Sequence, residues 1–410
     1  MKTFLILGAG TAGTMMAVKM AKKLDPQEWK IIQVDQDPVH YYQPGFLFIP
    51  FGVYKPEDVK QPKRRYIPRR VEYIESEVEV IQPAANKVKL AKDGREIAYD
   101  YLVIATGSTI RPDETEGLKD GGWGKNIFDF YTYEGTVALS KFLQRWEGGR
   151  LVLSVAEMPI KCPVAPLEFL FLADWYFTKK GIRNKVDLTL ATPLPGAFTK
   201  PVASAVLGDL LSRKGIHVEP DFAISDVDSV NNKVNSYDKR SLGYDLLVSI
   251  PVNMGSPLIE RSDMGDDLYF VPTDKHTLQS KQWPNVWVVG DAANIPASKA
   301  GAVAHFEMEF AIENILAHMQ GKEMTGKFDG HANCYIETGF GKAALIDFNY
   351  DVEPLTGKYP VPGVGPFTLL GESTINHWGK LAFRFMYWNM LMRDIPMPVS
   401  NTMSMAGKKA

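Results

Sequence analysis

The chain contains two cysteines, and the surroundings of one of them favour thiol chemistry. Cys162 lies between Lys161 and Pro163, where the following apolar spacing predicts a helix. A thiol at a helix N-terminus beside a lysine is expected to have a lowered pKa, because positive charge stabilises the thiolate that attacks sulfur. Cys334 lies far along the chain, so the pair is no disulfide framework. Two unrelated buried thiols are the alternative interpretation.

A glycine-rich turn near the N-terminus indicates dinucleotide binding. Gly8, Gly10 and Gly13 directly follow an apolar strand and open a helix. The first glycine permits the turn, the second lets backbone approach a pyrophosphate, and the third lets helix and strand pack closely. Asp35 ends the next strand, about 20 residues on, where a carboxylate can bind ribose hydroxyls. The complete turn consists of Gly8, Ala9, Gly10, Thr11, Ala12 and Gly13.

Two further strand ends favour FAD as the dinucleotide. Ala105, Thr106 and Gly107 stop one apolar strand, and Gly290 with Asp291 stops another. With the glycine turn, these segments resemble the two-dinucleotide-fold flavoprotein disulfide reductase superfamily. The resemblance implies that Asp291 binds the ribityl part of FAD, whereas the alternative is a cap for the next helix. The remaining expected cofactor contacts are Gln36, Gln43, Val78, Gly301 and Lys380.

A second strand–turn–helix unit begins near residue 150 and lacks the glycine fingerprint. Its first strand, residues 151–155, runs into a turn with no glycine, residues 154–159. Side chains there would keep backbone away from a pyrophosphate, which argues against an NAD(P)H site. The turn is followed instead by the Cys162 segment.

Three segments resemble the sulfide:quinone oxidoreductase and flavocytochrome c sulfide dehydrogenase group. Residues 162–168, reading Cys-Pro-Val-Ala-Pro-Leu-Glu, are similar to a Cys-Pro-Pro-x-Pro-x-Glu segment of that group. Residues 42–45 and the region from Cys334 to residue 343 are similar as well, and the resemblance covers essentially the whole chain.

This resemblance implies oxidation of sulfide by a Cys162/Cys334 redox pair, with FAD passing two electrons to a membrane quinone. Cys162 is expected to face the flavin and Cys334 to carry the persulfide, while Glu168 relays protons. For Glu168, a carboxylate on the helix surface is the alternative. Many sulfide:quinone oxidoreductases carry a third cysteine, but residues 128–133 contain none. Three alternatives stay open: the flavoprotein subunit of flavocytochrome c sulfide dehydrogenase, a type II NADH:quinone dehydrogenase, and a non-catalytic flavin-binding sensor built on this fold.

Strands and helices alternate along the segments that must position these residues. This order predicts an α/β fold with two Rossmann-like dinucleotide-binding domains and a C-terminal region with an amphipathic helix. Residues 1–110 and 285–325 are expected to form the FAD-binding domain. Residues 111–284 would form the second, NAD-type domain without a glycine fingerprint. Residues 326–410 would form a C-terminal region that contacts the acceptor and the membrane.

The predicted helix at 375–392 is the expected membrane contact. Its apolar residues recur at helical spacing, and His377, Lys380 and Arg384 lie on another stripe. Such a helix can lie in a bilayer interface, whereas packing on the core is the alternative. Lys380 is expected to reach the flavin, with Lys299 as a competitor. The apolar stripe comprises Trp378, Leu381, Ala382, Phe385, Trp388 and Met392.

Composition excludes several other classes. The formal net charge of −2 gives no reason to expect nucleic acid as a partner, and the basic run at 63–65 is interpreted as a solvated loop. No long apolar run spans a bilayer, no export signal is visible, and no residue spacing suggests a metal. We therefore expect a peripheral membrane protein on an undetermined side of the membrane, and both a monomer and a homo-oligomer stay open.

Overall fold

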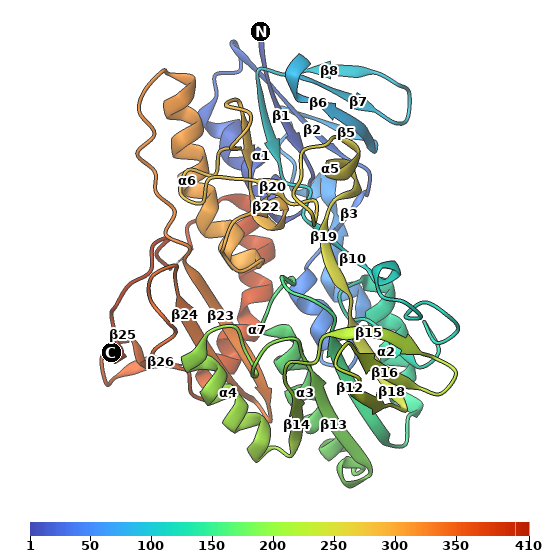
Figure 1. Cartoon of the computed structure of the whole chain (residues 1–410). Coiled ribbons are helices and arrows are strands. Elements are labelled where there is room, and N and C mark those ends of the chain that lie inside the picture. The colour runs from blue at the N-terminus through green and yellow to red at the C-terminus, as the bar shows by residue number, and fades with distance from the viewer. Residues whose placement is uncertain (398, 410) are drawn as a thin grey trace.

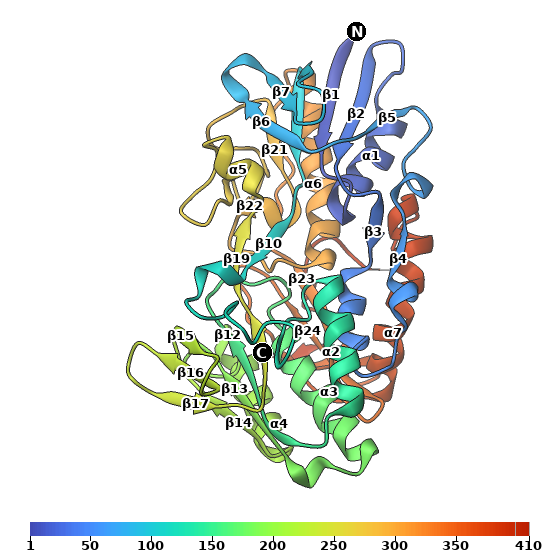
Figure 2. The ribbon, with the colours of Figure 1, turned by 90° about the vertical axis from the view of Figure 1, so that its right-hand side faces the viewer.

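The computed structural model describes residues 1–397 and 399–409. Two parallel sheets lie at opposite ends of the molecule, and the C-terminal helix runs along one side between them (Figures 1 and 2). The chain is α/β, with two Rossmann-like units and a C-terminal region that carries an amphipathic helix, as the sequence predicted.

The first sheet is parallel and is built from buried apolar strands, which suits a sheet covered on both faces. Its register pairs Leu7 with both Val34 and Ile104, so the residues after these strands meet at one edge. Helices α1 (Thr11–Lys23) and α6 (Gly301–Met319) pack against each other beside it. The strand order is β21 (Val286–Val288), β9 (Tyr101–Ile104), β1 (Lys2–Leu7), β2 (Trp29–Asp35) and β5 (Val71–Glu75).

The second sheet repeats this plan. Its helices are α2 (Tyr133–Arg145), α3 (Ala165–Lys180) and α4 (Pro201–Arg213). Helix α3 is buried over most of its length, because its own sequence carries apolar side chains on nearly every face. The strand order is β11 (Ile127–Phe128), β18 (Leu246–Ile250), β12 (Gly149–Val155), β13 (Val186–Ala191) and β14 (Ile216–Glu219).

A third, mixed sheet follows α6 and packs under the C-terminal helix α7 (Thr374–Asn389). Strand β23, which carries Cys334, also packs against α3. The sheet therefore brings the Cys334 segment to the helix that follows Cys162. Its strand order is β23 (Ala332–Gly339), β24 (Lys342–Phe348), β26 (Gly365–Leu369), β25 (Thr356–Val361) and β27 (Lys408–Lys409).

Smaller elements complete the fold. The antiparallel pair β10 (Ser108–Arg111) and β19 (Val252–Gly255) connects the two Rossmann-like units. Helix α5 (Pro257–Arg261) packs on β6 (Val78–Gln82). The other short elements are η1 (Gln43–Phe48), η8 (Leu391–Arg393), β3 (Val39–Tyr41), β4 (Lys60–Pro62), β7 (Lys87–Leu90), β8 (Glu96–Ala98), β15 (Ile224–Asp228), β16 (Lys233–Ser236), β17 (Ser241–Gly243), β20 (Val271–Pro272) and β22 (Ala293–Asn294).

Candidate functional site

The glycine turn has the shape that a dinucleotide pyrophosphate requires. Gly8 has a φ of +100°, and a Cβ there would lie 2.3 Å from the carbonyl oxygen of Ala105. A Cβ on Gly13 would lie 2.0 Å from the Gly8 oxygen, whereas one on Gly10 would meet open space. Helix α1 begins at Thr11 without a side-chain cap. Its first N–H groups are thus free to bind an anion in the space beside Gly10.

Asp35 lies beside this turn but also binds the protein itself. One oxygen accepts the Ala9 N–H at 2.6 Å, and the other pairs with the Lys63 ammonium at 2.6 Å. Lys63 is buried, so the solvated-loop interpretation of the basic run is wrong at this residue. The reason is the neighbouring carboxylate, which lies on another strand and is invisible in a local charge run.

The other expected cofactor residues lie mainly around the same sheet edge. Thr106 has a buried hydroxyl with no hydrogen-bond partner among the described residues, which suits a ligand contact. Ser108 donates to Asp291 at 3.4 Å, and Gly301 begins α6 with open space where a Cβ would lie. Asp291 does not cap α6, because that helix begins ten residues later, at Gly301.

Three expected contacts have other surroundings. Gln36 is exposed just after β2. Gln43 is exposed at the start of η1 and accepts a hydrogen bond from Lys161 at 3.4 Å. Val78 is buried in β6, where its carbonyl accepts from Arg261. Their contact with a cofactor stays a prediction.

Cys162 differs from its sequence expectation in both position and pKa. Helix α3 begins only at Ala165, and Cys162 has a φ of +49°, outside the helix. Its backbone N–H donates to the Lys299 carbonyl at 2.7 Å. Burial raises the pKa of the thiol, and the negative charge of Glu168 adds to this. The expected lowered pKa is therefore wrong, because desolvation of the thiolate outweighs the helix N-terminus.

Cys334 lies near Cys162, and both residues are half-buried. Burial raises its pKa to about 11, against the lowering effect of the Lys380 ammonium. The charge of Cys334 in turn raises the pKa of Cys162, and Lys380 opposes this too. Both thiols are free, neither being bonded in a disulfide with any described residue. The structure thus brings together two thiols, one ammonium and one carboxylate from segments far apart in the chain.

Glu168 and Lys380 form a buried ion pair beside the thiols. Glu168 is 1% exposed, so the interpretation as a helix-surface carboxylate is wrong. Its Oε1 accepts from the Lys380 ammonium at 2.7 Å and from the Glu337 backbone N–H at 2.7 Å. Lys380 also donates to the Tyr335 carbonyl at 2.9 Å. Burial raises the pKa of Glu168, although Lys380 opposes this effect.

Some apolar residues of helix α7 are exposed to solvent, and others pack into the core. Trp378 and Phe385 are 65% and 66% exposed, whereas Trp388 is buried. With the exposed Ile375 and Ala382, Trp378 and Phe385 form a continuous apolar stripe, which we call the α7 stripe.

The basic side chains of α7 are paired with carboxylates of the same chain. Lys380 binds Glu168, His377 binds Glu337 at 2.8 Å, and Arg384 pairs with Asp58 at 3.4 Å. The expected cationic stripe is therefore wrong as a surface feature, because each charge meets a partner on a distant segment. No helix among residues 1–397 and 399–409 is long and apolar enough to cross a membrane.

A hydrogen-bonded network that the sequence did not indicate joins α7 to the glycine turn. The Tyr387 hydroxyl lies 2.6 Å from both Thr11 Oγ1 and His40 Nε2. Burial lowers the pKa of His40 to about 3, so the ring is neutral. Lys299, the competitor of Lys380, donates to the carbonyl oxygens of Asp291 and Ala293.

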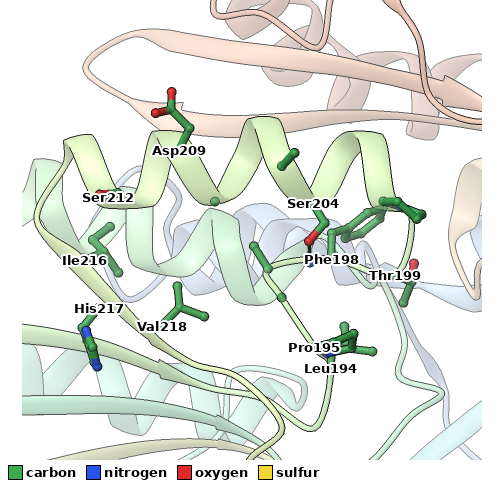
Figure 3. A pocket seen from close by; sticks show the side chains of 15 residues that line it. Leu194, Pro195, Phe198, Thr199, Ser204, Asp209, Ser212, Ile216, His217 and Val218 are labelled. Carbon is green, nitrogen blue, oxygen red and sulfur yellow. Dashed lines mark hydrogen bonds between the residues drawn. The ribbon is translucent and has the colours of Figure 1, made fainter.

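A hollow whose lining contains neither thiol lies in the second Rossmann-like unit. It measures about 750 Å³ and lies between α4, the loop after β13 and β14 (Figure 3). Phe198 and Leu194 line it from the loop, and Asp209 and His217 are the ionisable residues among its described walls. Its described walls contain no lysine or arginine.

Comparisons with known proteins agree with this geometry. Residues 2–141 match the family described as pyridine nucleotide-disulphide oxidoreductase. The mitochondrial sulfide:quinone oxidoreductase of Dictyostelium discoideum is 29% identical, over 85% of this chain and 78% of its own length. The mouse (Mus musculus) protein of that name is 26% identical, over 95% of this chain and 86% of its own length.

A solved structure shares the whole fold. The sulfide:quinone oxidoreductase of Aquifex aeolicus superimposes with a TM-score of 0.79 at 21% identity, over 96% of this chain and 92% of that chain. Over most of its length the chain is thus similar in sequence and in fold to the sulfide:quinone oxidoreductases, the group that its own residues indicated.

Proposed function

We propose that this protein oxidises sulfide through Cys162 and Cys334 and transfers two electrons by way of FAD to a membrane quinone. One observation carries the proposal: two half-buried thiols from distant segments lie near each other and near the Glu168–Lys380 ion pair. The names of the relatives agree with this activity.

FAD is proposed to lie along the carboxyl edge of the first sheet. The N-terminus of α1 would bind its pyrophosphate, Asp35 its ribose, and the Asp291 and Thr106 side chains its other polar groups. Proteins of this superfamily are FAD-binding flavoproteins. When bound, FAD supplies a two-electron acceptor beside the thiols.

The cysteine pair supplies the sulfur chemistry. A hydrosulfide ion that attacks one sulfur of the oxidised pair breaks the S–S bond, forms a persulfide there and releases the other cysteine as a thiolate. Lys380 would stabilise that thiolate, since its charge lowers the pKa of both thiols. Burial works in the opposite direction and keeps the thiolate a strong electron donor. We retain Cys162 as the flavin-facing sulfur and Cys334 as the persulfide carrier.

The electron acceptor is proposed to be a quinone that approaches from lipid. The α7 stripe offers exposed Trp378 and Phe385 for insertion into a bilayer interface. The protein would thus lie on the membrane as a peripheral protein.

Anaerobic stopped-flow spectroscopy tests the activity. Sulfide, but not NADH, is expected to bleach the flavin absorbance of the wild-type protein, and decylubiquinone is expected to restore it. Cys162→Ser and Cys334→Ser are each expected to abolish bleaching by sulfide while still binding FAD. Bleaching by NADH alone, or full sulfide bleaching in either variant, would refute the proposal. Restoration by cytochrome c but not by decylubiquinone would favour the flavocytochrome alternative.

A further inference from the structure

The Tyr387 hydroxyl connects helix α7 to the glycine turn through two short hydrogen bonds. It lies 2.6 Å from Oγ1 of Thr11, the first residue of α1, and 2.6 Å from Nε2 of His40 on β3. Tyr387 and His40 are buried, and neither side chain has another hydrogen-bond partner among residues 1–397 and 399–409. The three groups therefore form one chain of hydrogen bonds that ends at Thr11.

The hydrogens of this chain can be counted. Burial lowers the pKa of His40 to about 3, so the neutral ring carries one N–H, and the two hydroxyls carry one hydrogen each. Two hydrogen bonds use two of these three hydrogens, and the third can remain on His40, on Tyr387 or on Thr11. On His40 or Tyr387 it would be a buried donor without a described partner, which is unfavourable. On Thr11 it is free to bind a ligand.

Thr11 lies where the cofactor pyrophosphate is proposed to bind. It directly follows Gly10, beside which a Cβ would meet open space, and it is half-buried. A threonine inside a helix commonly bonds to the carbonyl one turn earlier, but no helical turn precedes the first residue of α1. A negative oxygen in this space would attract the Thr11 hydrogen and repel the Thr11 lone pairs. It thus favours the arrangement in which Tyr387 donates to Thr11.

We propose that Tyr387 is a positioning residue for the cofactor: it accepts from His40, donates to Thr11 and so leaves the Thr11 hydroxyl as a donor to the FAD pyrophosphate. The inference rests on the FAD site proposed above. Tyr387 and His40 act through Thr11 and do not touch the cofactor. Helix α7 thereby contributes to cofactor affinity, and bound FAD keeps the His40 proton on Nε2.

A double-mutant cycle tests this coupling. Thr11→Val removes the donor with little change in shape, and Tyr387→Phe keeps the ring that packs on Tyr42 and Trp388. The dissociation constant of FAD is measured from the flavin fluorescence that appears when the holoenzyme is diluted. It is expected to rise about tenfold in Thr11→Val and about threefold in Tyr387→Phe. The double variant is expected to match Thr11→Val, because no hydroxyl is left for Tyr387 to orient.

Tyr101→Phe is the matched control, because it removes a similar hydrogen bond between a tyrosine and a histidine. The Tyr101 hydroxyl lies 2.9 Å from Nδ1 of His318. Tyr101 begins β9, and it is the other end of this strand that lies beside the glycine turn. This variant is expected to bind FAD as the wild type does. Thr11→Ser, which keeps a hydroxyl, is expected to stay within about twofold of the wild type.

The protonated nitrogen of His40 gives a second readout that does not depend on the stability of Tyr387→Phe. ¹⁵N NMR of the wild-type holoenzyme with labelled histidine distinguishes the two ring nitrogens. The His40 signals are assigned by their loss in His40→Gln. They are expected to show a hydrogen on Nε2 and none on Nδ1.

Three results would overturn the positioning role. One is an unchanged dissociation constant of FAD in Tyr387→Phe. Another is a double variant about thirtyfold weaker than the wild type, since additive effects indicate that Tyr387 acts independently of Thr11. The third is a hydrogen on Nδ1 of His40 in the holoenzyme. Failure of sulfide to bleach the flavin of a holoenzyme that shows the expected cycle would instead count against the proposed function alone.

Discussion

At the scale of single residues, Glu307 provides a pH-dependent term in stability. This α6 carboxyl is 2% exposed and accepts the Gly290 N–H at 2.6 Å. Burial raises its pKa from 4.5 to about 7. The folded protein thus keeps a proton that the unfolded chain loses. The contribution of this proton to the free energy of unfolding is fully present below pH 4.5 and is lost as pH rises through about 7. The free energy of unfolding then falls by about 3 kcal/mol.

Glu307→Gln is expected to remove this loss, because an amide oxygen can still accept from Gly290 and does not titrate. Urea unfolding at pH 5 and pH 8 measures it. The variant is expected to gain about 2 kcal/mol relative to the wild type between these values. Glu313→Gln, an exposed position on the same helix, is the control and is expected to show no such gain. Equal pH dependence in all three proteins would contradict the prediction.

Residue identities and spacing were enough to predict a glycine turn between a strand and a helix, and Asp35 at the end of the next strand. They were not enough for the charge state of Cys162. Lys161 and the coming helix suggested a stabilised thiolate, but desolvation depends on neighbours from β23 and α7. The Lys63–Asp35 pair escaped prediction for the same reason, since both partners must be placed in space first.

At the scale of elements, Gly379 sets how closely α7 approaches β23. A Cβ there would lie 2.7 Å from the end of the Tyr335 ring. Glycine in a helix interior is usually about 1 kcal/mol less stable than alanine. At Gly379 the lack of a side chain is what leaves room for the Tyr335 ring. Its contact holds Lys380 over the Tyr335 carbonyl and beside Glu168.

Gly379→Ala is therefore expected to destabilise the protein by about 1 to 3 kcal/mol despite its better helix propensity. Gly208→Ala in α4 is the matched control, because its Cβ would meet only Ala197 at 3.8 Å. That change is expected to stabilise by up to about 1 kcal/mol. Urea unfolding of both variants measures the difference, and the same sign for both would argue against a steric role for Gly379.

Long, periodic elements could be predicted, and the third sheet could not. The sequence indicated α1, α3, α6 and α7 within a few residues, because each has a helical apolar repeat. The strands β23 to β26 lie in a segment rich in glycine, proline and aromatics, which shows no simple periodic pattern. Their sheet packs against α3 and α7, two helices that are distant or separate in the sequence. Their pairing is decided by contacts between distant segments.

At the scale of the whole molecule, α7 connects the proposed lipid contact to both functional regions. Its outer face carries the α7 stripe, and its inner face binds Glu168 through Lys380 and Thr11 through Tyr387. Because Lys380 and Arg384 are each paired with a carboxylate of the same chain, attraction between these cations and anionic lipid contributes little. Membrane binding through this helix must then depend on apolar burial.

The double variant Trp378→Glu/Phe385→Glu is expected to weaken binding to phospholipid vesicles at least about tenfold, since each aromatic contributes about 1.5 to 3 kcal/mol when buried. Raising salt to about 1 M is expected to leave wild-type binding intact, because the contact is not electrostatic. Vesicle flotation measures both.

Val230→Glu/Tyr237→Glu, at exposed positions of the small β15–β17 region, is the control and is expected to bind normally. Sulfide should still bleach the flavin of the α7 variant, whereas reduction of quinone embedded in vesicles should fall with binding. Release of the wild type by salt, or undiminished flotation of the α7 variant, would place the membrane contact elsewhere.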